Sequence, residues 1–122
     1  MCGIAGLYQR DERVDLGRLH RMSRLLRHRG PDDEGILLLD HKAGEWMTLG
    51  GADTPSAVFA SPHRFAPGHA TPGASGDARF TVGLLNRRLA IVDLSPAGHG
   101  PMSSPSSPPK RRRSARSTSS AW

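Results

Sequence analysis

The stretch Met1-Cys-Gly-Ile-Ala-Gly-Leu-Tyr8 opens the chain and carries its one cysteine, Cys2. Its apolar residues predict a short strand, although glycine weakens a strand unless backbone or a ligand must approach it closely. The polar run 9–13 follows at once, so this apolar segment is too short for a signal peptide or a membrane-spanning helix. One cysteine cannot form an internal disulfide, and we expect a cytoplasmic protein without membrane partners.

The positive charge of the chain is concentrated at its C-terminal end. The 122 residues carry a net charge of +6, but residues 103–122 hold five of the 17 basic residues and none of the 11 acidic ones. Residues 1–102 therefore carry 12 basic and 11 acidic residues, a net charge of +1. The composition of 103–122, rich in serine, proline and arginine, predicts a disordered tail.

Hydrophobic periodicity predicts a small α+β domain ahead of this tail. Apolar residues at helical spacing favour a helix over residues 15–28, with Asp15 as its N-cap. Further apolar runs predict strands at the following positions: 36–39 and 45–49, paired as a hairpin, then 80–84 and 89–92. Between them, residues 50–79 are rich in glycine and proline, which predicts a long loop.

The position of Cys2 points to one kind of chemistry. Removal of the initiator methionine would leave Cys2 with a free α-amine beside its own thiol. An unperturbed α-amine and an unperturbed thiol titrate within about one pH unit of each other, so the amine can act as general base toward the thiol. This is the N-terminal nucleophile arrangement; the alternative is an ordinary small residue at a chain start.

Two further blocks support the catalytic interpretation. His28-Arg-Gly-Pro-Asp-Asp-Glu-Gly35 follows the predicted helix, and Asn86-Arg-Arg-Leu-Ala-Ile-Val-Asp-Leu-Ser-Pro-Ala-Gly-His-Gly-Pro-Met102 closes the ordered part. With residues 1–6, these blocks resemble the start of glutamine-hydrolysing asparagine synthases, in their class II glutamine amidotransferase domain. The resemblance covers residues 1–102, with 50–79 as an inserted loop.

The resemblance implies both a fold and a reaction. The fold would be the first half of an αββα N-terminal nucleophile hydrolase domain. The reaction would be attack of a thiolate on the side-chain amide of glutamine, release of ammonia, and hydrolysis of a glutamyl thioester. The family passes the ammonia to a synthetase domain that amidates aspartate with ATP and magnesium, and full-length members are expected to be homodimers. No cofactor is implied for this chain itself.

The resemblance also assigns roles to individual residues. Cys2 matches the nucleophile, and Arg88 matches the arginine that binds the glutamine α-carboxylate, a task suited to its planar fork. Leu89 and Ile91 match positions whose backbone lines the glutamine pocket, while Arg29 is expected to support the wall behind the cysteine. Without the resemblance, we would interpret three arginines as solvent-facing charge: Arg29, Arg87 and Arg88.

The sequence departs from the family pattern within and after the third block. Leu85 and Asn86 stand where the family often has Gly-His, and Gly100 where it often has Gln. The family's Asn-Gly-Glu-Ile-Tyr-Asn strand, which forms the oxyanion hole, does not occur in the chain, nor does a synthetase segment. Losing one oxyanion donor costs roughly 10²–10³ in rate, so we expect an inactive, truncated chain whose tail is read out of frame.

Besides a small interaction protein without catalysis, whose core would have to form from few apolar residues, two other interpretations are open from the sequence. The basic run in 103–122 could bind nucleic acid non-specifically through phosphates, although aromatic residues are interleaved with it only at Trp122. The histidines show no close ligand pair of the kind that zinc sites need, and no metal site is expected. They stand at positions 20, 28, 41, 63, 69 and 99.

Overall fold

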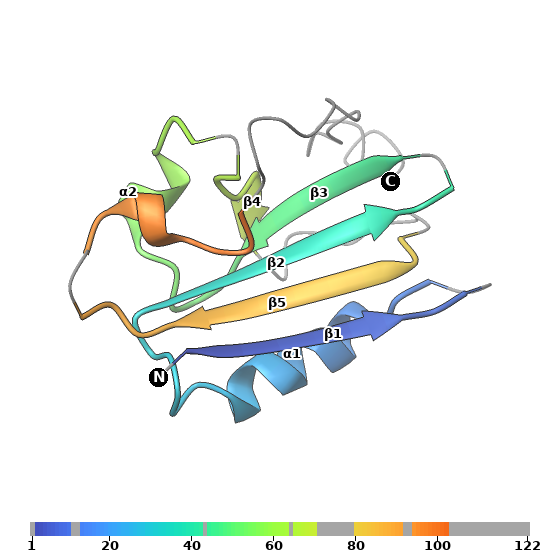
Figure 1. Cartoon of the computed structure of the whole chain (residues 1–122), viewed down its shortest axis with the longest axis horizontal. Helices are drawn as coiled ribbons and strands as arrows, with labels where there is room; N and C mark the ends of the chain where they lie inside the picture. Colours follow the sequence, from blue (N-terminus) through green and yellow to red (C-terminus); the bar gives the residue numbers. More distant parts are fainter. Residues whose placement is uncertain are drawn as a thin grey trace.

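The computed structural model describes residues 2–10, 13–42, 44–63, 65–70, 80–91 and 94–102. Within these ranges the chain forms a five-stranded sheet in the order β1-β5-β2-β3-β4, with one longer helix against it (Figure 1). This mixed architecture agrees with the predicted α+β class. The strands are β1 Gly3–Tyr8, β2 Asp33–Asp40, β3 Glu45–Gly50, β4 His69–Ala70 and β5 Val82–Arg88; the helices are α1 Leu16–Leu25, α2 Ser56–Phe59 and the 3₁₀ turn η1 Pro96–Gly98.

The strand pairings confirm the first predicted strand and the predicted hairpin. β2 and β3 run antiparallel from Gly35 opposite Gly50 to Asp40 opposite Glu45. Gly44, in the connecting turn, has a φ of 70°, which is the left-handed region that glycine enters without a steric penalty. β3 pairs parallel with β4, while β1 and β2 pair antiparallel with the two edges of β5.

Of the two strands predicted at 80–84 and 89–92, the first is confirmed over 82–84, whereas the second was wrong at 89–91, and residue 92 lies outside the described residues. One strand, β5, spans Val82–Arg88, and residues 89 and 90 lie beyond its end. β5 lies between β1 and β2 and is hydrogen-bonded on both edges. Backbone pairing on two sides therefore carries the strand through the polar residues 86–88, where apolar periodicity alone gave no signal.

Helix α1 is shorter than the predicted 15–28 but begins where expected. The Asp15 side chain accepts a hydrogen bond from the Arg18 backbone N–H at 3.3 Å, which confirms it as the N-cap. The helix ends at Leu25, and residues 26–29 form turns. Leu19 is fully buried, faces Gly83 of β5 and belongs to the core between α1 and the sheet. The core comprises Leu19, Ile36, Leu38, Met47, Leu49, Phe80 and Leu85.

The predicted loop 50–79 contains more structure than its composition suggested. It carries α2 and the short strand β4. Val58 and Ala66 are buried, and the Thr48 hydroxyl donates a hydrogen bond to the Ala66 carbonyl at 2.9 Å. Residues 71–79 and the predicted tail 103–122 lie outside the described residues.

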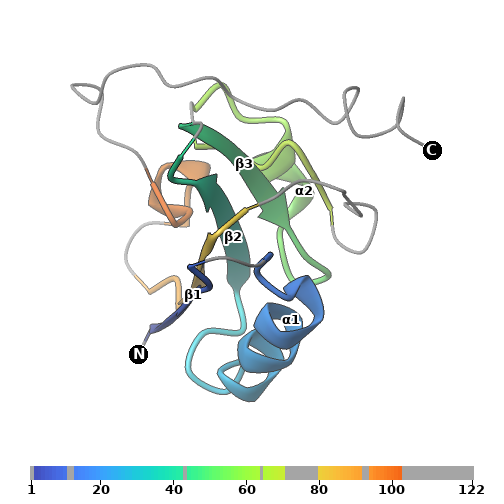
Figure 2. The same cartoon turned by 90° about the vertical axis from the view of Figure 1, so that its right-hand side faces the viewer.

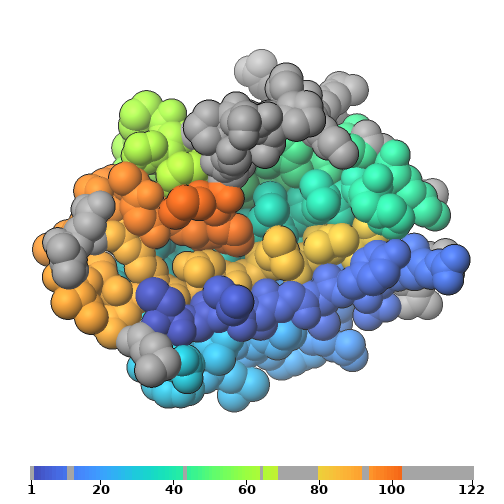
Figure 3. Space-filling view, in the orientation of Figure 1, coloured from blue at the N-terminus to red at the C-terminus, as the bar shows by residue number. Residues whose placement is uncertain are grey.

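The two faces of the sheet differ in what covers them. Figure 2, seen nearly along the sheet, places α1 on one face and the segment 94–102 with η1 on the other. We call the second one the open face, because 94–102 covers only part of it. In Figure 3 the surfaces of β1 and β5 lie uncovered below this segment, and Ile4 is 77% exposed there. No helix among the described residues is both long and apolar enough to cross a bilayer.

Candidate functional site

Cys2 lies directly before β1, at the end where β1 meets the last residues of β5. Gly3 pairs with Arg87, so the cysteine stands beside the residues that leave β5. Its thiol is exposed, and the Leu89 backbone N–H donates to Sγ at 3.5 Å. Arg29 Nε donates to the Cys2 carbonyl at 3.3 Å. Two other residues singled out from the sequence thus contact Cys2, Leu89 at the thiol and Arg29 at the carbonyl.

The segment behind the thiol is held by Asp32, a residue that the sequence analysis did not single out. The Ala90 N–H donates to Asp32 Oδ2 at 2.9 Å, and the Asp32 N–H donates to the Arg88 carbonyl at 3.1 Å. Asp32 belongs to the second resembling block, so its place there was the available signal. It fixes residues 88–90 and, through Leu89, the environment of the Cys2 sulfur.

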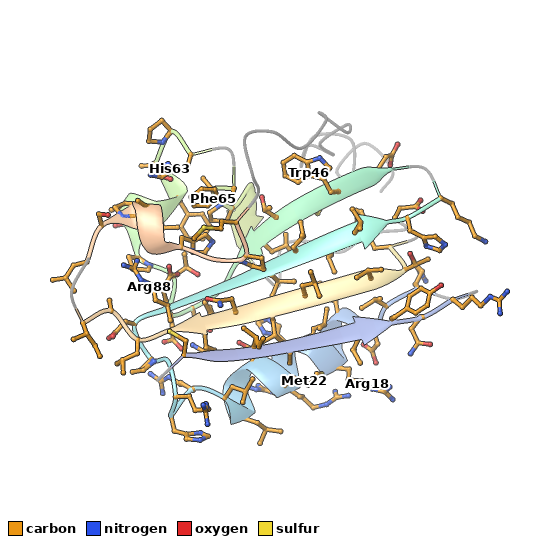
Figure 4. All side chains as sticks on the ribbon, viewed as in Figure 1. Arg18, Met22, Trp46, His63, Phe65 and Arg88 are labelled. Carbon is orange, nitrogen blue, oxygen red and sulfur yellow. The ribbon has the colours of Figure 1, made fainter. Side chains whose placement is uncertain are left out.

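Arg88 ends β5 on the open face. Strand alternation puts Arg87 toward α1 and Arg88 on the opposite face. By the same alternation Cys2 lies opposite to Gly3, whose Cα faces Leu26 beside α1, and so on the same face as Arg88. Arg88 is half-buried, and its Nη1 donates to the Ser95 carbonyl at 2.8 Å. Figure 4 shows the side chain beneath the turn that contains η1.

The two remaining predicted pocket residues follow Arg88. Leu89 is half-buried, whereas Ile91 is 73% exposed. Their expected role was through the backbone, and the N–H of Leu89 is directed at the thiol.

An apolar hollow of about 410 Å³ lies along the open face beside these residues. It runs between β1 and β5, where Ile4 pairs with Asn86. Its floor and walls are therefore mostly backbone and aliphatic side chains. They comprise Ile4, Ala5, Gly6, Leu84, Leu85, Asn86 and Pro101.

Arg87, on the α1 face, is not solvent-facing charge. Its side chain is 1% exposed, and its guanidinium contacts Glu34 Oε2 and Asp53 Oδ2, each at 2.8 Å. Its Nε also donates to the Ser23 carbonyl at 3.0 Å. Burial raises the pKa of Glu34 more than Arg87 lowers it, whereas the hydrogen bond from Arg87 holds the pKa of Asp53 below its usual range.

Another buried pair joins β2 to the segment 94–102. His99 Nδ1 lies 2.7 Å from Asp33 Oδ2, and both side chains are 3% exposed. Sequence reasoning missed this pair because its members are 66 residues apart. Among the described residues, no group of three histidine, cysteine or acidic side chains is placed to hold a metal ion.

The comparisons with known proteins agree with the resemblance. The chain is 29% identical over 102 residues to a protein of Methanocaldococcus jannaschii that carries the name of a glutamine-hydrolyzing asparagine synthetase. The match covers 84% of this chain but only 13% of that protein. No protein-family model matches the chain, and no solved structure matches it significantly.

Proposed function

We propose that this chain carries the nucleophile-bearing part of a glutamine-hydrolysing site of the asparagine synthase type, in an N-terminal nucleophile hydrolase fold. One observation carries the proposal: the thiol of Cys2 is held against the Leu89 N–H, on the face of the sheet where Arg88 also lies. Nucleophile and carboxylate anchor thus belong to one surface, as binding of a single small amino acid requires.

The chemistry follows from the N-terminal position of the cysteine. Once the initiator methionine is removed, the α-amine accepts the thiol proton, directly or through water. The sulfur attacks the side-chain amide carbon of glutamine, and the amine returns the proton to the departing nitrogen, which leaves as ammonia. Water then attacks the thioester with the amine again as base, releasing glutamate and restoring the thiol.

Arg88 supplies specificity in this scheme. A guanidinium presents N–H donors in a plane and can hold a carboxylate with two parallel hydrogen bonds. Arg88 Nη1 donates to the Ser95 carbonyl, which holds the side chain at the 95–99 turn. Arg88 would hold the α-carboxylate and leave the amide end of glutamine to reach Cys2.

The chain alone is expected to lack measurable glutaminase activity. Neither of the family's oxyanion donors has a counterpart in the sequence, and each such donor is worth roughly 10²–10³ in rate. Ammonia would serve an ATP- and magnesium-dependent amidation of aspartate in a synthetase domain, for which no block of this chain is a match. Glutamine recognition, rather than turnover, is therefore the property to test.

The test is covalent labelling of Cys2 by a glutamine analogue that carries a diazoketone in place of the amide. Intact-protein mass spectrometry should show one adduct, with a rate that saturates in analogue and falls when L-glutamine is added. Cys2→Ser should abolish labelling, and Arg88→Lys, which keeps the charge but loses the fork, should raise the half-saturating concentration. Iodoacetamide, which needs no carboxylate anchor, serves as the control reagent. Labelling that stays linear in analogue and is indifferent to L-glutamine would overturn the proposal.

A further inference from the structure

The turn over residues 95–99 contacts the ends of two neighbouring strands at once. Asp33 of β2 and Arg88 of β5 are opposite each other in the sheet, and both belong to the open face. His99, at one end of the turn, is paired with Asp33. Ser95, at the other end, accepts the hydrogen bond from Arg88. One short turn therefore joins a buried acid to the proposed carboxylate anchor.

The contact with Asp33 is the stronger attachment of the two. Its N···O distance is 2.7 Å and both side chains are 3% exposed, so water does not compete for the bond. A buried carboxylate is tolerated in a protein only when it is paired. Asp33 Oδ1 has no hydrogen-bond partner among the described residues, so the carboxyl group depends on the contact of its Oδ2 with His99. Displacing the ring would strand Asp33, so the pair fixes the turn in place.

The 95–99 turn also restricts the Arg88 side chain. The Nη1 donor is held by the Ser95 carbonyl, and Gly98 lies close to the guanidinium. A side chain at Gly98 would meet the Arg88 guanidinium, with its Cβ 2.8 Å from Nε. The turn therefore contacts the Arg88 guanidinium at two places, at the Ser95 carbonyl and at Gly98.

We propose that His99 is a positioning residue: by seating the 95–99 turn on Asp33, it fixes the orientation of the Arg88 fork. The consequence for glutamine rests on the function proposed above. A long side chain that is already immobilised loses less entropy when it binds a carboxylate. Loss of the His99–Asp33 bond should therefore weaken glutamine recognition without changing the thiol.

Two matched substitutions separate positioning from packing. In His99→Asn the side-chain amide nitrogen takes the place of Nδ1 and can still donate to Asp33. In His99→Gln the amide nitrogen takes the place of Nε2, which faces away from Asp33. Both are polar and smaller than or similar to histidine; because His99→Gln also leaves Asp33 without its partner, far-ultraviolet circular dichroism of both variants must first match that of the unsubstituted chain. Ala97→Ser, at an exposed position of the same turn, is the control.

The readouts are labelling of Cys2 and the mobility of Arg88. His99→Gln should raise the half-saturating analogue concentration on the order of threefold to tenfold, the effect of freeing one long side chain. Its maximal labelling rate and its reaction with iodoacetamide should stay unchanged. His99→Asn and Ala97→Ser should match the unsubstituted chain. Nitrogen-15 NMR of the Arg88 guanidinium should show hindered rotation that His99→Gln releases and His99→Asn keeps.

The possible results test the positioning role of His99 and the proposed function separately. Equal losses in both His99 variants, or no loss in either, would overturn the positioning role. Unsaturable labelling of the unsubstituted chain would overturn the proposed function, and the Arg88 NMR signals would then decide the positioning role without any ligand. Release of Arg88 in His99→Gln alone would support it in that case as well.

Discussion

Arg87→Met is the substitution that should damage the fold most. Methionine is unbranched and of similar length to arginine, but it is apolar. The substitution therefore removes the contacts to Glu34 and Asp53, both at 2.8 Å, and the bond to the Ser23 carbonyl. Because Arg87 is 1% exposed and Glu34 7%, the substitution leaves an uncompensated carboxylate in the interior. Breaking a buried pair in this way costs about 3–5 kcal/mol, a large share of the 5–15 kcal/mol that stabilises a typical domain.

The chain provides its own matched control for this measurement. Arg27 contacts the same carboxylate, Asp53, at 3.0 Å, but its side chain is 62% exposed. An exposed pair contributes about 1 kcal/mol or less, so Arg27→Met should be close to neutral. Both variants remove a positive charge from Asp53, but only Arg87→Met does so in the interior and also leaves Glu34 without its partner.

The assay is urea unfolding followed by far-ultraviolet circular dichroism at pH 7. Adding Glu34→Gln to Arg87→Met should recover part of the loss, since the stranded charge is then gone; the interaction energy between the two sites should be about 1–3 kcal/mol. If Arg87→Met lost no more than Arg27→Met, or if Glu34→Gln recovered nothing, the argument from burial would be refuted.

Three further outcomes follow from the site and the fold. Intact mass should show the initiator methionine removed, leaving Cys2 first; a retained methionine would exclude the α-amine as base. Gly30→Ala should destabilise the chain in denaturant titrations, because the new Cβ would lie 2.5 Å from the Arg87 carbonyl carbon. Since the folded pKa of Asp53 is lowered by Arg87, its contribution is present above pH about 4 and is lost as the pH falls through the lowered folded pKa; Asp53→Asn should flatten that part of the stability profile.

Local signals were sufficient for the elements that are held together locally. The α1 helix has its cap at Asp15 and its apolar stripe within ten residues, and the β2–β3 hairpin closes over a short turn with a glycine of positive φ. Both were predicted with end errors of a few residues. Helix α2 was missed because its four residues carry too little periodicity to register, and its burial depends on contacts such as that of Phe59 with Gly50.

Long-range pairing accounts for the parts that were not predictable. Arg87 looked like surface charge because its partners, Glu34 and Asp53, are remote in sequence. Nothing local distinguishes Arg87 from Arg88, yet one is buried against α1 and the other belongs to the open face. The resemblance named Arg88 but was silent on the buried pair of Asp33 and His99, which only the folded chain brings together.

The two departures from the family pattern inside β5 can now be judged physically. Leu85 was a concern if the position required a glycine with positive φ, but no non-glycine residue in the described ranges has positive φ. Leu85 is 2% exposed and belongs to the core, so its bulk is absorbed on the α1 face and does not reach the thiol. Asn86, on the other face, lies against Gly100, where a Cβ would come within 3.0 Å of Asn86 Oδ1. Gly100, the third departure, therefore makes room for Asn86, because a side chain at position 100 would clash with the Asn86 amide.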